Sequence, residues 1–256
     1  MEHQQLTLRE RQLEYLRILK ELDRYCTQKG LRYYIGCGTL IGAVRHKGFI
    51  PWDDDLDVFM PEPDFNTFAK EYKSNDFQIQ SCWNSLAHQH IFARFCSNSI
   101  GCIPSGMYQE DFGIDVYIIY GAPSEMKKRE EHINNVFKLI KRRDRIRRIR
   151  NGLARRCLWP IKNLECRLLN KSIKRIIMEF RKYDFSNSEY IWPFGGGKLL
   201  LKKELYGTPV RLPFEDGFFL APEHYHEVLT MGYGDYMELP PVEKRKPYHG
   251  SDYYHK

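Results

Sequence analysis

Long apolar runs are missing from this sequence. No stretch of the 256 residues stays apolar over the ~18 positions that a membrane-spanning helix needs, and the mean hydropathy is -0.57. The opening residues, MEHQQLTLRERQ, lack the apolar core of a signal peptide. We therefore expect neither a transmembrane segment nor export through a cleaved leader.

Paired cysteines are also missing. The chain has 7 cysteines, an odd number, and no two are spaced as Cys-x-x-Cys. This argues against a disulfide framework and against a zinc site, and it predicts a reducing, cytoplasmic compartment. There are no internal repeats or low-complexity segments, and the composition of 42% hydrophobic and 14% aromatic residues indicates a folded globular protein.

The charge is unevenly distributed along the chain. Between residues 127 and 182 there are 20 Lys and Arg against 5 Asp and Glu, a local charge of +15, whereas the other 200 residues carry 20 against 28, or -8. A basic segment on an otherwise acidic body predicts contact with an anionic partner: nucleic acid, a phosphate-rich glycan or a membrane surface.

The pattern of apolar residues predicts a mixed α/β (α+β) fold. A capping box at Thr7–Glu10 begins a helix, and Gly30 is placed to end it. The other expected elements are strands at 31–35, 55–60, 77–81, 90–96 and 113–120, short helices after 36 and at 64–72, mainly helical structure over 124–182 with a break near 151–152 and 160, a hairpin of 210–214 with 218–220, a helix at 222–231, and a loop-like tail from 240.

This pattern suggests three regions. Residues 1–123 form the expected catalytic core, 124–200 a basic and mainly helical segment, and 201–256 a hairpin and helix region that packs back on the core.

A cluster of carboxylates is the most informative feature. On a strand, Asp55 and Asp57 would project from the same side, about 6–7 Å apart, and two such charges repel each other. A divalent cation would remove that repulsion, and oxygen ligands suit Mg²⁺ or Mn²⁺. Asp115 is a lone acid in an apolar strand, so the three acids together could hold two metal ions if the two strands are neighbours.

The alternative is that these acids cap a turn or form a solvated loop. The glycine-rich segment before them, GCGTLIG at 36–42, favours the metal site. Glycines let backbone N–H groups approach a phosphate, and the N-terminus of the following helix adds positive partial charge.

The order of these motifs resembles the nucleotidyltransferase fold shared with DNA polymerase beta. The segments GCGTLIG at 36–42 and RHKGFIPWDDDLDV at 45–58 look more closely like the LicD family of phosphocholine transferases, with fukutin and its relatives, the ribitol-phosphate transferases, as distant cousins. The motif GYGDYM at 232–237, followed by Pro240 and Pro241, is a second match.

The resemblance implies a metal-dependent transfer of phosphocholine, or a related phospho-alcohol, from a CDP-linked donor such as CDP-choline to a glycan hydroxyl, with release of CMP. It implies that Asp55, Asp57 and Asp115 are catalytic and hold two metal ions, Mg²⁺ or Mn²⁺. Carried onto this sequence, the donor-binding candidates are Gly38, Thr39, Gly42, Arg45, Lys47, Trp52, Arg94 and Asp235, with Asp53 as a candidate outer ligand.

Recognition of choline would depend on aromatic rings, because a quaternary ammonium donates no hydrogen bonds. The chain has 17 Tyr, 15 Phe and 4 Trp, and Trp52 lies beside the acids. Most of these rings are equally compatible with ordinary packing, and ribitol phosphate would need hydrogen-bonding groups instead.

The basic segment allows three interpretations. Residues 141–182 could dock on anionic lipid at the inner face of the membrane, bind an anionic acceptor, or form a solvated helix face. Two other functions stay open: nucleotidyl transfer from an NTP, with pyrophosphate leaving, and nucleic-acid binding. No recognised nucleic-acid module supports the last, so no nucleic-acid partner is expected.

Overall fold

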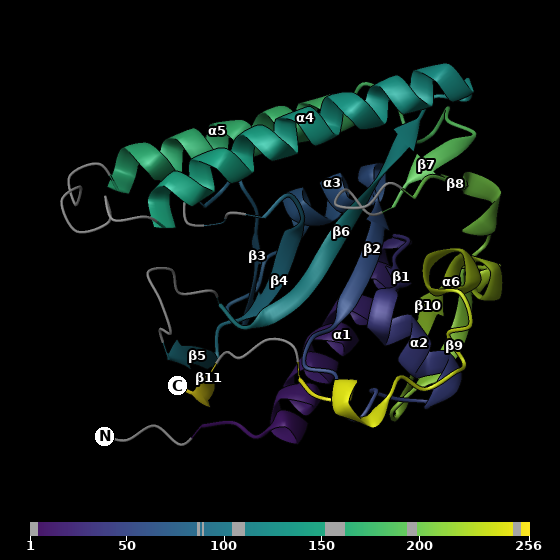
Figure 1. Ribbon diagram of the computed structural model, residues 1–256. Coiled ribbons are helices and arrows are strands. Elements are labelled where there is room, and N and C mark those ends of the chain that lie inside the picture. The colour runs from purple at the N-terminus through teal and green to yellow at the C-terminus, as the bar shows by residue number, and fades with distance from the viewer. Residues whose placement is uncertain are drawn as a thin grey trace.

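The computed structural model describes residues 5–85, 88, 90–103, 111–151, 162–193, 199–247 and 252–256. It is a mixed α/β structure, as the sequence predicts, with a curled sheet at its centre (Figure 1). No helix in these described ranges is both long and apolar enough to cross a bilayer. Cys26, Cys37, Cys82, Cys96 and Cys102 are free thiols.

The first helix, α1 (Leu8–Lys29), has the predicted ends. The Thr7 hydroxyl accepts a hydrogen bond from the Glu10 N–H, and the Glu10 carboxylate accepts from the Thr7 N–H at 2.8 Å, which completes the capping box. Gly30 adopts the left-handed conformation, with φ of 66°, and ends the helix. Both boundaries are therefore fixed by local chemistry that can be read from the sequence.

The main sheet has the strand order β1-β2-β6-β4-β3, and β7 and β8 extend it from the far end of β6. Strands β2 and β6 are parallel, whereas the other pairs are antiparallel. The bounds are β1 (Tyr34–Ile35), β2 (Asp57–Pro61), β3 (Phe77–Gln80), β4 (Ala93–Ser97), β6 (Gly113–Ala122), β7 (Tyr190–Trp192) and β8 (Leu201–Lys202).

The two faces of the sheet carry different residues. On one face Val58, Met60 and Val116 join the main core beneath α1 and α3 (Glu62–Glu71). On the other face Phe59 and Tyr117 belong to a second, smaller cluster. Because side chains alternate along a strand, Asp57 and Asp115 share this second face with the two aromatic rings.

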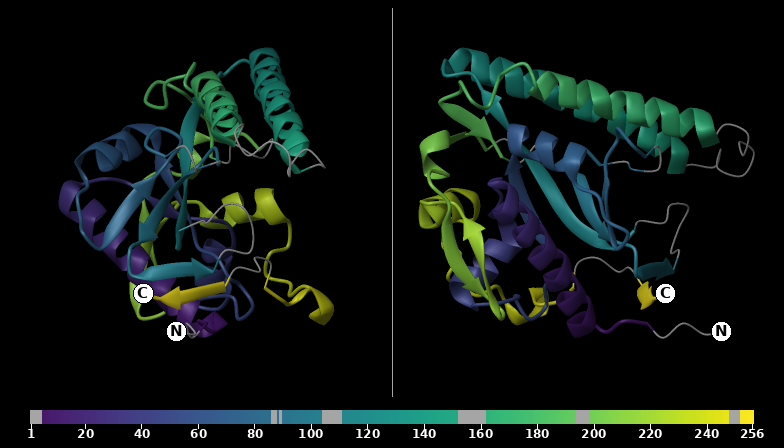
Figure 2. Two further views of the ribbon diagram at one scale, coloured as in Figure 1. Left: turned by 90° about the vertical axis from the view of Figure 1, so that its left-hand side faces the viewer. Right: turned by 180° about the vertical axis from the view of Figure 1, so that it is seen from behind.

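Two long helices, α4 (Met126–Asn151) and α5 (Lys162–Phe180), form an antiparallel pair along one side of the sheet. Figure 2 shows the pair on the side away from α1. The buried residues Ile173, Ile177 and Phe180 hold α5 in place, and the Phe180 ring stacks on Tyr120 of β6 at 5.0 Å between centroids. The helical prediction is confirmed here, and the predicted break lies in 152–161, outside the described residues.

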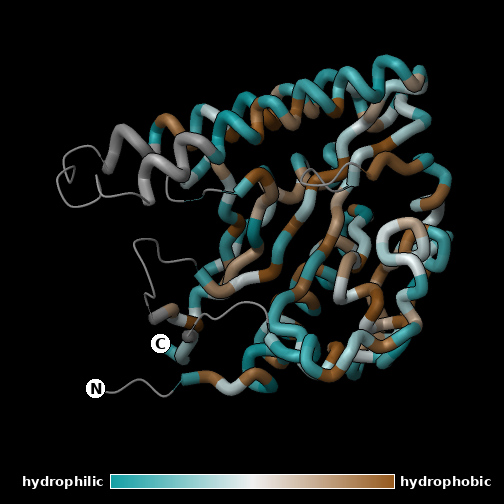
Figure 3. Tube along the Cα trace, viewed as in Figure 1, coloured by the Kyte–Doolittle hydropathy of each residue, from teal (hydrophilic) through white to brown (hydrophobic). Residues whose placement is uncertain are grey.

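The described part of α4 is rich in polar residues. Most of the described length of α4 is hydrophilic in Figure 3, whereas brown hydrophobic residues follow the strands.

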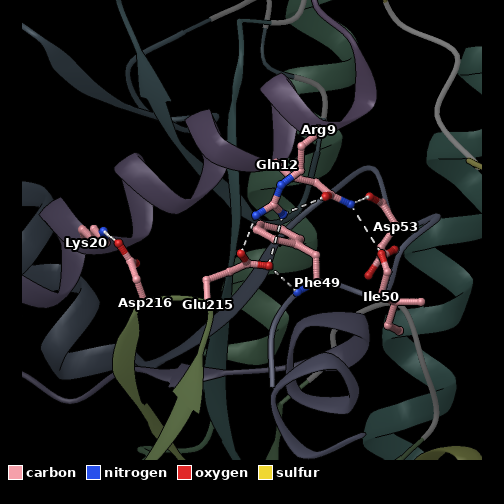
Figure 4. A network of polar contacts seen from close by, with 8 residues as sticks. All are labelled: Arg9, Gln12, Lys20, Phe49, Ile50, Asp53, Glu215 and Asp216. Atoms are coloured by element: carbon pink, nitrogen blue, oxygen red, sulfur yellow. Dashed lines mark hydrogen bonds and ion pairs between the residues drawn. The ribbon is translucent and has the colours of Figure 1, made fainter. Parts of the chain in front are cut away.

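The C-terminal region begins with a hairpin of β9 (Val210–Phe214) and β10 (Gly217–Ala221), followed by α6 (Tyr225–Tyr233). The hairpin turn is fastened to α1 by two ion pairs, Arg9 with Glu215 and Lys20 with Asp216 (Figure 4). Both the hairpin and the helix confirm the prediction.

The tail differs from the prediction. Residues from 240 were expected to be loop-like, but β11 (Asp252–His255) pairs with β5 (Ile100–Ile103), a strand that was also not predicted. The two strands are about 150 positions apart in the chain, so neither segment carries a local signal of its partner.

Candidate active site

Asp57 and Asp115 are neighbours across two strands. Asp57 is the first residue of β2, and it lies opposite Asp115 in the parallel register of β2 and β6. Adjacent strands are separated by about 4.8 Å, so the two carboxylates emerge side by side on the same face. Asp57 is only 8% exposed, whereas Asp115 is half-buried.

Hydrogen bonds hold the N-terminus of α2 (Cys37–Arg45) next to Asp57. The Gly36 N–H donates to the Asp57 carbonyl oxygen at 3.0 Å, and the Asp57 N–H donates to the Thr39 hydroxyl at 3.0 Å. Cys37, the first helical residue, has a positive φ of 46°, which a residue with a side chain rarely adopts. These contacts place the positive end of α2 directly beside the paired acids.

The position of Asp55 corrects the sequence prediction. Asp55 lies in the loop before β2, because pairing with β6 begins only where the Asp115 N–H donates to the Leu56 carbonyl oxygen at 3.0 Å. The strand expected at 55–60 therefore begins two residues later, and the prediction that Asp55 and Asp57 project from the same side of one strand is wrong. Asp55 is half-buried, and its charge still acts on Asp57.

Asp53 belongs to the same loop, and its carboxylate lies against Gly38 of α2. A Cβ added to Gly38 would lie 2.6 Å from the Asp53 carboxylate oxygen Oδ2, so a larger residue at position 38 would displace this carboxylate. The Gln12 side chain of α1 donates to the Asp53 carbonyl oxygen at 2.9 Å and holds the loop from behind (Figure 4).

Burial and the neighbouring carboxylates dominate the electrostatics at Asp57. Burial raises the pKa of Asp57 well above its ordinary value, and the negative charges of Asp55, Asp115 and Asp53 raise it further. Within the described ranges, no three His, Cys, Asp or Glu side chains already stand together as a metal site. The oxygen donors and their mutual repulsion nevertheless fit a hard divalent cation.

Asp115 has a cationic partner, Arg94. The two residues are opposite each other in the register of β4 and β6, and Arg94 Nε lies 2.9 Å from Asp115 Oδ1. Arg94 Nη2 also donates to the Gly113 carbonyl oxygen at 3.0 Å, and the residue is 8% exposed. Arg94 was predicted to offset phosphate charge, whereas here its guanidinium offsets the charge of Asp115.

The two cations of the 45–47 loop bind backbone atoms. Arg45 Nη1 donates to the carbonyl oxygens of Tyr236 at 2.6 Å and Glu238 at 3.0 Å, so it holds the C-terminal motif. The exposed Lys47 donates to the Val44 carbonyl oxygen at 3.1 Å. Their predicted role at the donor phosphates stays a prediction.

Gly42 and Trp52 shape the loop between α2 and the acids. A Cβ on Gly42 would lie 2.5 Å from the Gly48 carbonyl oxygen. The half-buried Trp52 ring has the Arg245 guanidinium 5.6 Å from its centroid, an aromatic–cation contact that the sequence did not reveal. The Trp52 ring thus contacts a cation that belongs to this chain, the Arg245 guanidinium, and its predicted contact with the donor stays a prediction.

The C-terminal motif reaches the acids through Tyr233. The Tyr233 hydroxyl and the Asp57 carboxylate both hydrogen-bond to the Cys37 thiol, and burial together with the nearby Asp57 charge raises the pKa of that thiol well above its ordinary value. Asp235 lies at the exposed end of the motif, where its carboxylate accepts from the Met237 N–H at 3.2 Å. The structure therefore joins segments that are about 195 residues apart in the chain.

An apolar cavity of about 240 Å³ opens beside this junction. No motif in the sequence indicates this cavity, because its walls come from the separate elements β1, α2, β2, β8 and α6. Its described lining is Ile35, Gly36, Cys37, Leu40, Phe59, Pro193, Leu199, Leu201, Tyr206, Pro222, Val228, Leu229, Gly232 and Tyr233.

Comparison with known proteins places this site in a class. Residues 30–140, which contain the paired acids and α2, match the family model described as LicD/FKTN/FKRP, nucleotidyltransferase domain. Lipopolysaccharide cholinephosphotransferase LicD of Haemophilus influenzae is 32% identical over 97% of this chain and 98% of its own length. Ribitol 5-phosphate transferase FKRP of Homo sapiens is 45% identical over 47 residues, 17% of this chain and 10% of that protein.

The chain belongs to the LicD family. The similarity to the Haemophilus influenzae protein runs through nearly the whole of both chains, so it includes the helical pair and the C-terminal motif as well as the acids. This membership supports a phosphotransferase, and it confirms the resemblance seen in the sequence.

Proposed function

We propose that this protein transfers phosphocholine from CDP-choline to a hydroxyl group of a cell-surface glycan and releases CMP. The observation that carries the proposal is the pairing of Asp57 with Asp115 beside the N-terminus of α2. It is supported by the similarity over 97% of the chain to a protein named for cholinephosphate transfer to lipopolysaccharide.

The proposed step is a displacement at phosphorus. The acceptor oxygen bonds to the phosphorus that bears choline, the bond from that phosphorus to the CMP oxygen breaks, and CMP leaves with the electron pair. The hydroxyl proton of the acceptor passes to a carboxylate, for which Asp115 is the candidate, since it is half-buried and faces the site.

Mg²⁺ or Mn²⁺, as one ion or two, is the proposed cofactor. Asp57 and Asp115 would hold it, with Asp55 from the preceding loop, because their oxygen atoms are the ligands such ions prefer. When bound, the metal would neutralise charge on the donor phosphates.

The remaining contacts to the donor come from the turn at α2. Backbone N–H groups at Gly38 and Thr39 lie in the first turn of this helix, where an anion is favoured. The Thr39 hydroxyl accepts from the Asp57 N–H, so its own hydrogen remains for donation to a phosphate oxygen. Thr39 would thus connect the donor to the position of Asp57.

The test separates this reaction from nucleotidyl transfer. The protein is incubated with Mg²⁺ and either CDP-choline or CTP, and the products are separated by chromatography. We expect CMP from CDP-choline, with more in the presence of a lipopolysaccharide acceptor. Pyrophosphate from CTP, without CMP from CDP-choline, would favour the nucleotidyltransferase alternative.

We also propose that the helical pair brings a cytoplasmic enzyme to the inner face of an anionic membrane. The described part of α5 exposes Arg167, Lys171 and Arg175 together with the apolar Leu168 and Met178, which are 46% and 56% exposed. Exposed cations and apolar side chains on one helix favour an anionic lipid surface, at about 1 kcal/mol for each cation near it.

Liposome sedimentation tests this second proposal. We expect the wild type to sediment with vesicles containing anionic lipid and to be released by salt. A Lys171→Gln, Arg175→Gln double variant should bind more weakly, whereas Lys70→Gln on α3, which is not part of the helical pair, serves as the matched control. Equal sedimentation with neutral and anionic vesicles would contradict the proposal.

A further inference from the structure

The cavity beside Cys37 is uncharged. None of its described lining residues carries a formal charge, and its polar side chains are limited to Cys37, Tyr206 and Tyr233. Tyr206 is 4% exposed, and burial raises the pKa of its hydroxyl well above the ordinary value, so it stays neutral. The volume of about 240 Å³ is below the ~300–1,000 Å³ of pockets for drug-sized ligands, so it suits a group of a few atoms.

The cavity is separated from the acids by one side chain. Cys37 lines it, and the same thiol hydrogen-bonds to the Asp57 carboxylate. Phe59 also lines it, two residues after Asp57 and on the same face of β2. A group attached to a phosphate at the acids could therefore reach into the cavity.

The walls include three aromatic side chains, and their chemistry restricts the occupant. Phe59, Tyr206 and Tyr233 line the cavity from β2, the segment after β8, and α6. Aromatic faces attract cations, and a quaternary ammonium brings no N–H group that would need an acceptor. A primary ammonium or a polyol would bring donors into a space with few partners, and each unpaired buried donor weakens binding about 5- to 150-fold.

We propose that this cavity receives the trimethylammonium end of the donor, and that Tyr233 and Tyr206 determine the preference for choline over ethanolamine or ribitol. The proposal rests on the proposed function, because it assigns a part of the donor to a part of the site. The cavity would select the donor alcohol. The acids would not select it, because they would act only at the phosphate end of the donor.

The test uses Tyr233 because this residue is 52% exposed, so its replacement should not unfold the protein. Tyr233→Leu removes the ring, and Tyr233→Phe removes only the hydroxyl that contacts Cys37. Phe218→Leu is the matched control, because Phe218 is 61% exposed and lies on β10 outside the cavity lining. For each variant kcat/KM is measured with CDP-choline, CDP-ethanolamine and CDP-ribitol.

We expect Tyr233→Leu to lower the ratio of kcat/KM for CDP-choline to that for CDP-ethanolamine by about 2- to 30-fold, the range of one aromatic–cation contact. Tyr233→Phe and Phe218→Leu should keep the ratio of the wild type. A Tyr233→Leu ratio equal to that of Phe218→Leu, or a wild type that prefers CDP-ribitol, would overturn the proposal.

A binding experiment separates this proposal from the proposed function. Saturation-transfer NMR with choline chloride reports contact of the methyl groups without any turnover. A methyl signal in the wild type and Tyr233→Phe that is lost in Tyr233→Leu supports the cavity even if no CDP-alcohol is turned over. No signal in the wild type, or equal signals in all variants, overturns it.

Discussion

Replacing Gly42 by alanine should destabilise the protein although glycine is a poor helix former. Gly42 lies inside α2, where alanine would ordinarily gain about 1 kcal/mol. Its added Cβ would, however, lie 2.5 Å from the Gly48 carbonyl oxygen, 3.4 Å from Phe214 and 3.5 Å from the Ile50 nitrogen. The nearest of these atoms belongs to the backbone, which cannot rotate away.

The two effects can be compared in magnitude. Overpacking of this kind costs about 1–3 kcal/mol, and backbone at 2.5 Å places it at the upper end, so the net loss is about 2 kcal/mol. For a chain of this size that corresponds to a fall in Tm of about 4–8 °C. The displaced loop leads to Asp53, so CMP release should fall as well.

Gly232→Ala is the matched control for stability. Gly232 also lies in a helix, α6, but nothing stands within 4 Å of its added Cβ. We expect this variant to gain up to about 1 kcal/mol and its Tm to rise. Calorimetry of the two variants therefore gives opposite signs, and a Tm for Gly42→Ala at or above that of the wild type would refute the close contact.

Three further predictions concern single side chains. Asp57→Asn should abolish CMP release while near-ultraviolet circular dichroism stays native, and retained turnover would reject the role of Asp57. Arg94→Met should cost about 3–5 kcal/mol in urea unfolding because it leaves the Asp115 charge without its buried partner, and Arg94→Met with Asp115→Asn should recover part of this loss. A hydrogen bond from Arg9 lowers the pKa of Glu215 below 4.5, so the stability it contributes is present above pH 4.5 and lost as the pH falls through the lowered value. Glu215→Gln should therefore be less stable than the wild type at pH 7, by a difference that narrows as the pH falls below 4.5, and a difference that stays constant with pH would contradict this linkage.

Local signals explain what the sequence predicted correctly. The capping box fixed the start of α1 and Gly30 its end, because both depend on neighbours within four residues. The apolar periodicity of 113–120 indicated the strand that carries Asp115. From the sequence, the three acids could come together only if this strand is next to the one that carries Asp57. The register of β2 and β6 shows that the two strands are neighbours.

Contacts between distant segments explain what was missed. Asp55 was placed on a strand because the alternation of residues does not show where pairing begins, which depends on the Asp115 N–H. The ion pair of Arg94 with Asp115 and the bonds of Arg45 to the C-terminal motif join residues that are 21 or more positions apart. Strand β11 and the apolar cavity could not be predicted for the same reason. Each of them is formed by segments that lie far apart in the chain.

The most direct test of the account is the metal-dependent release of CMP from CDP-choline by the purified wild-type protein and by Asp57→Asn. With Mg²⁺ and a lipopolysaccharide acceptor, we predict CMP and choline-labelled glycan in equal amounts from the wild type, and neither from the variant or after addition of EDTA. A wild type that forms no CMP under these conditions, or a variant that forms as much, would contradict the central role of the paired acids.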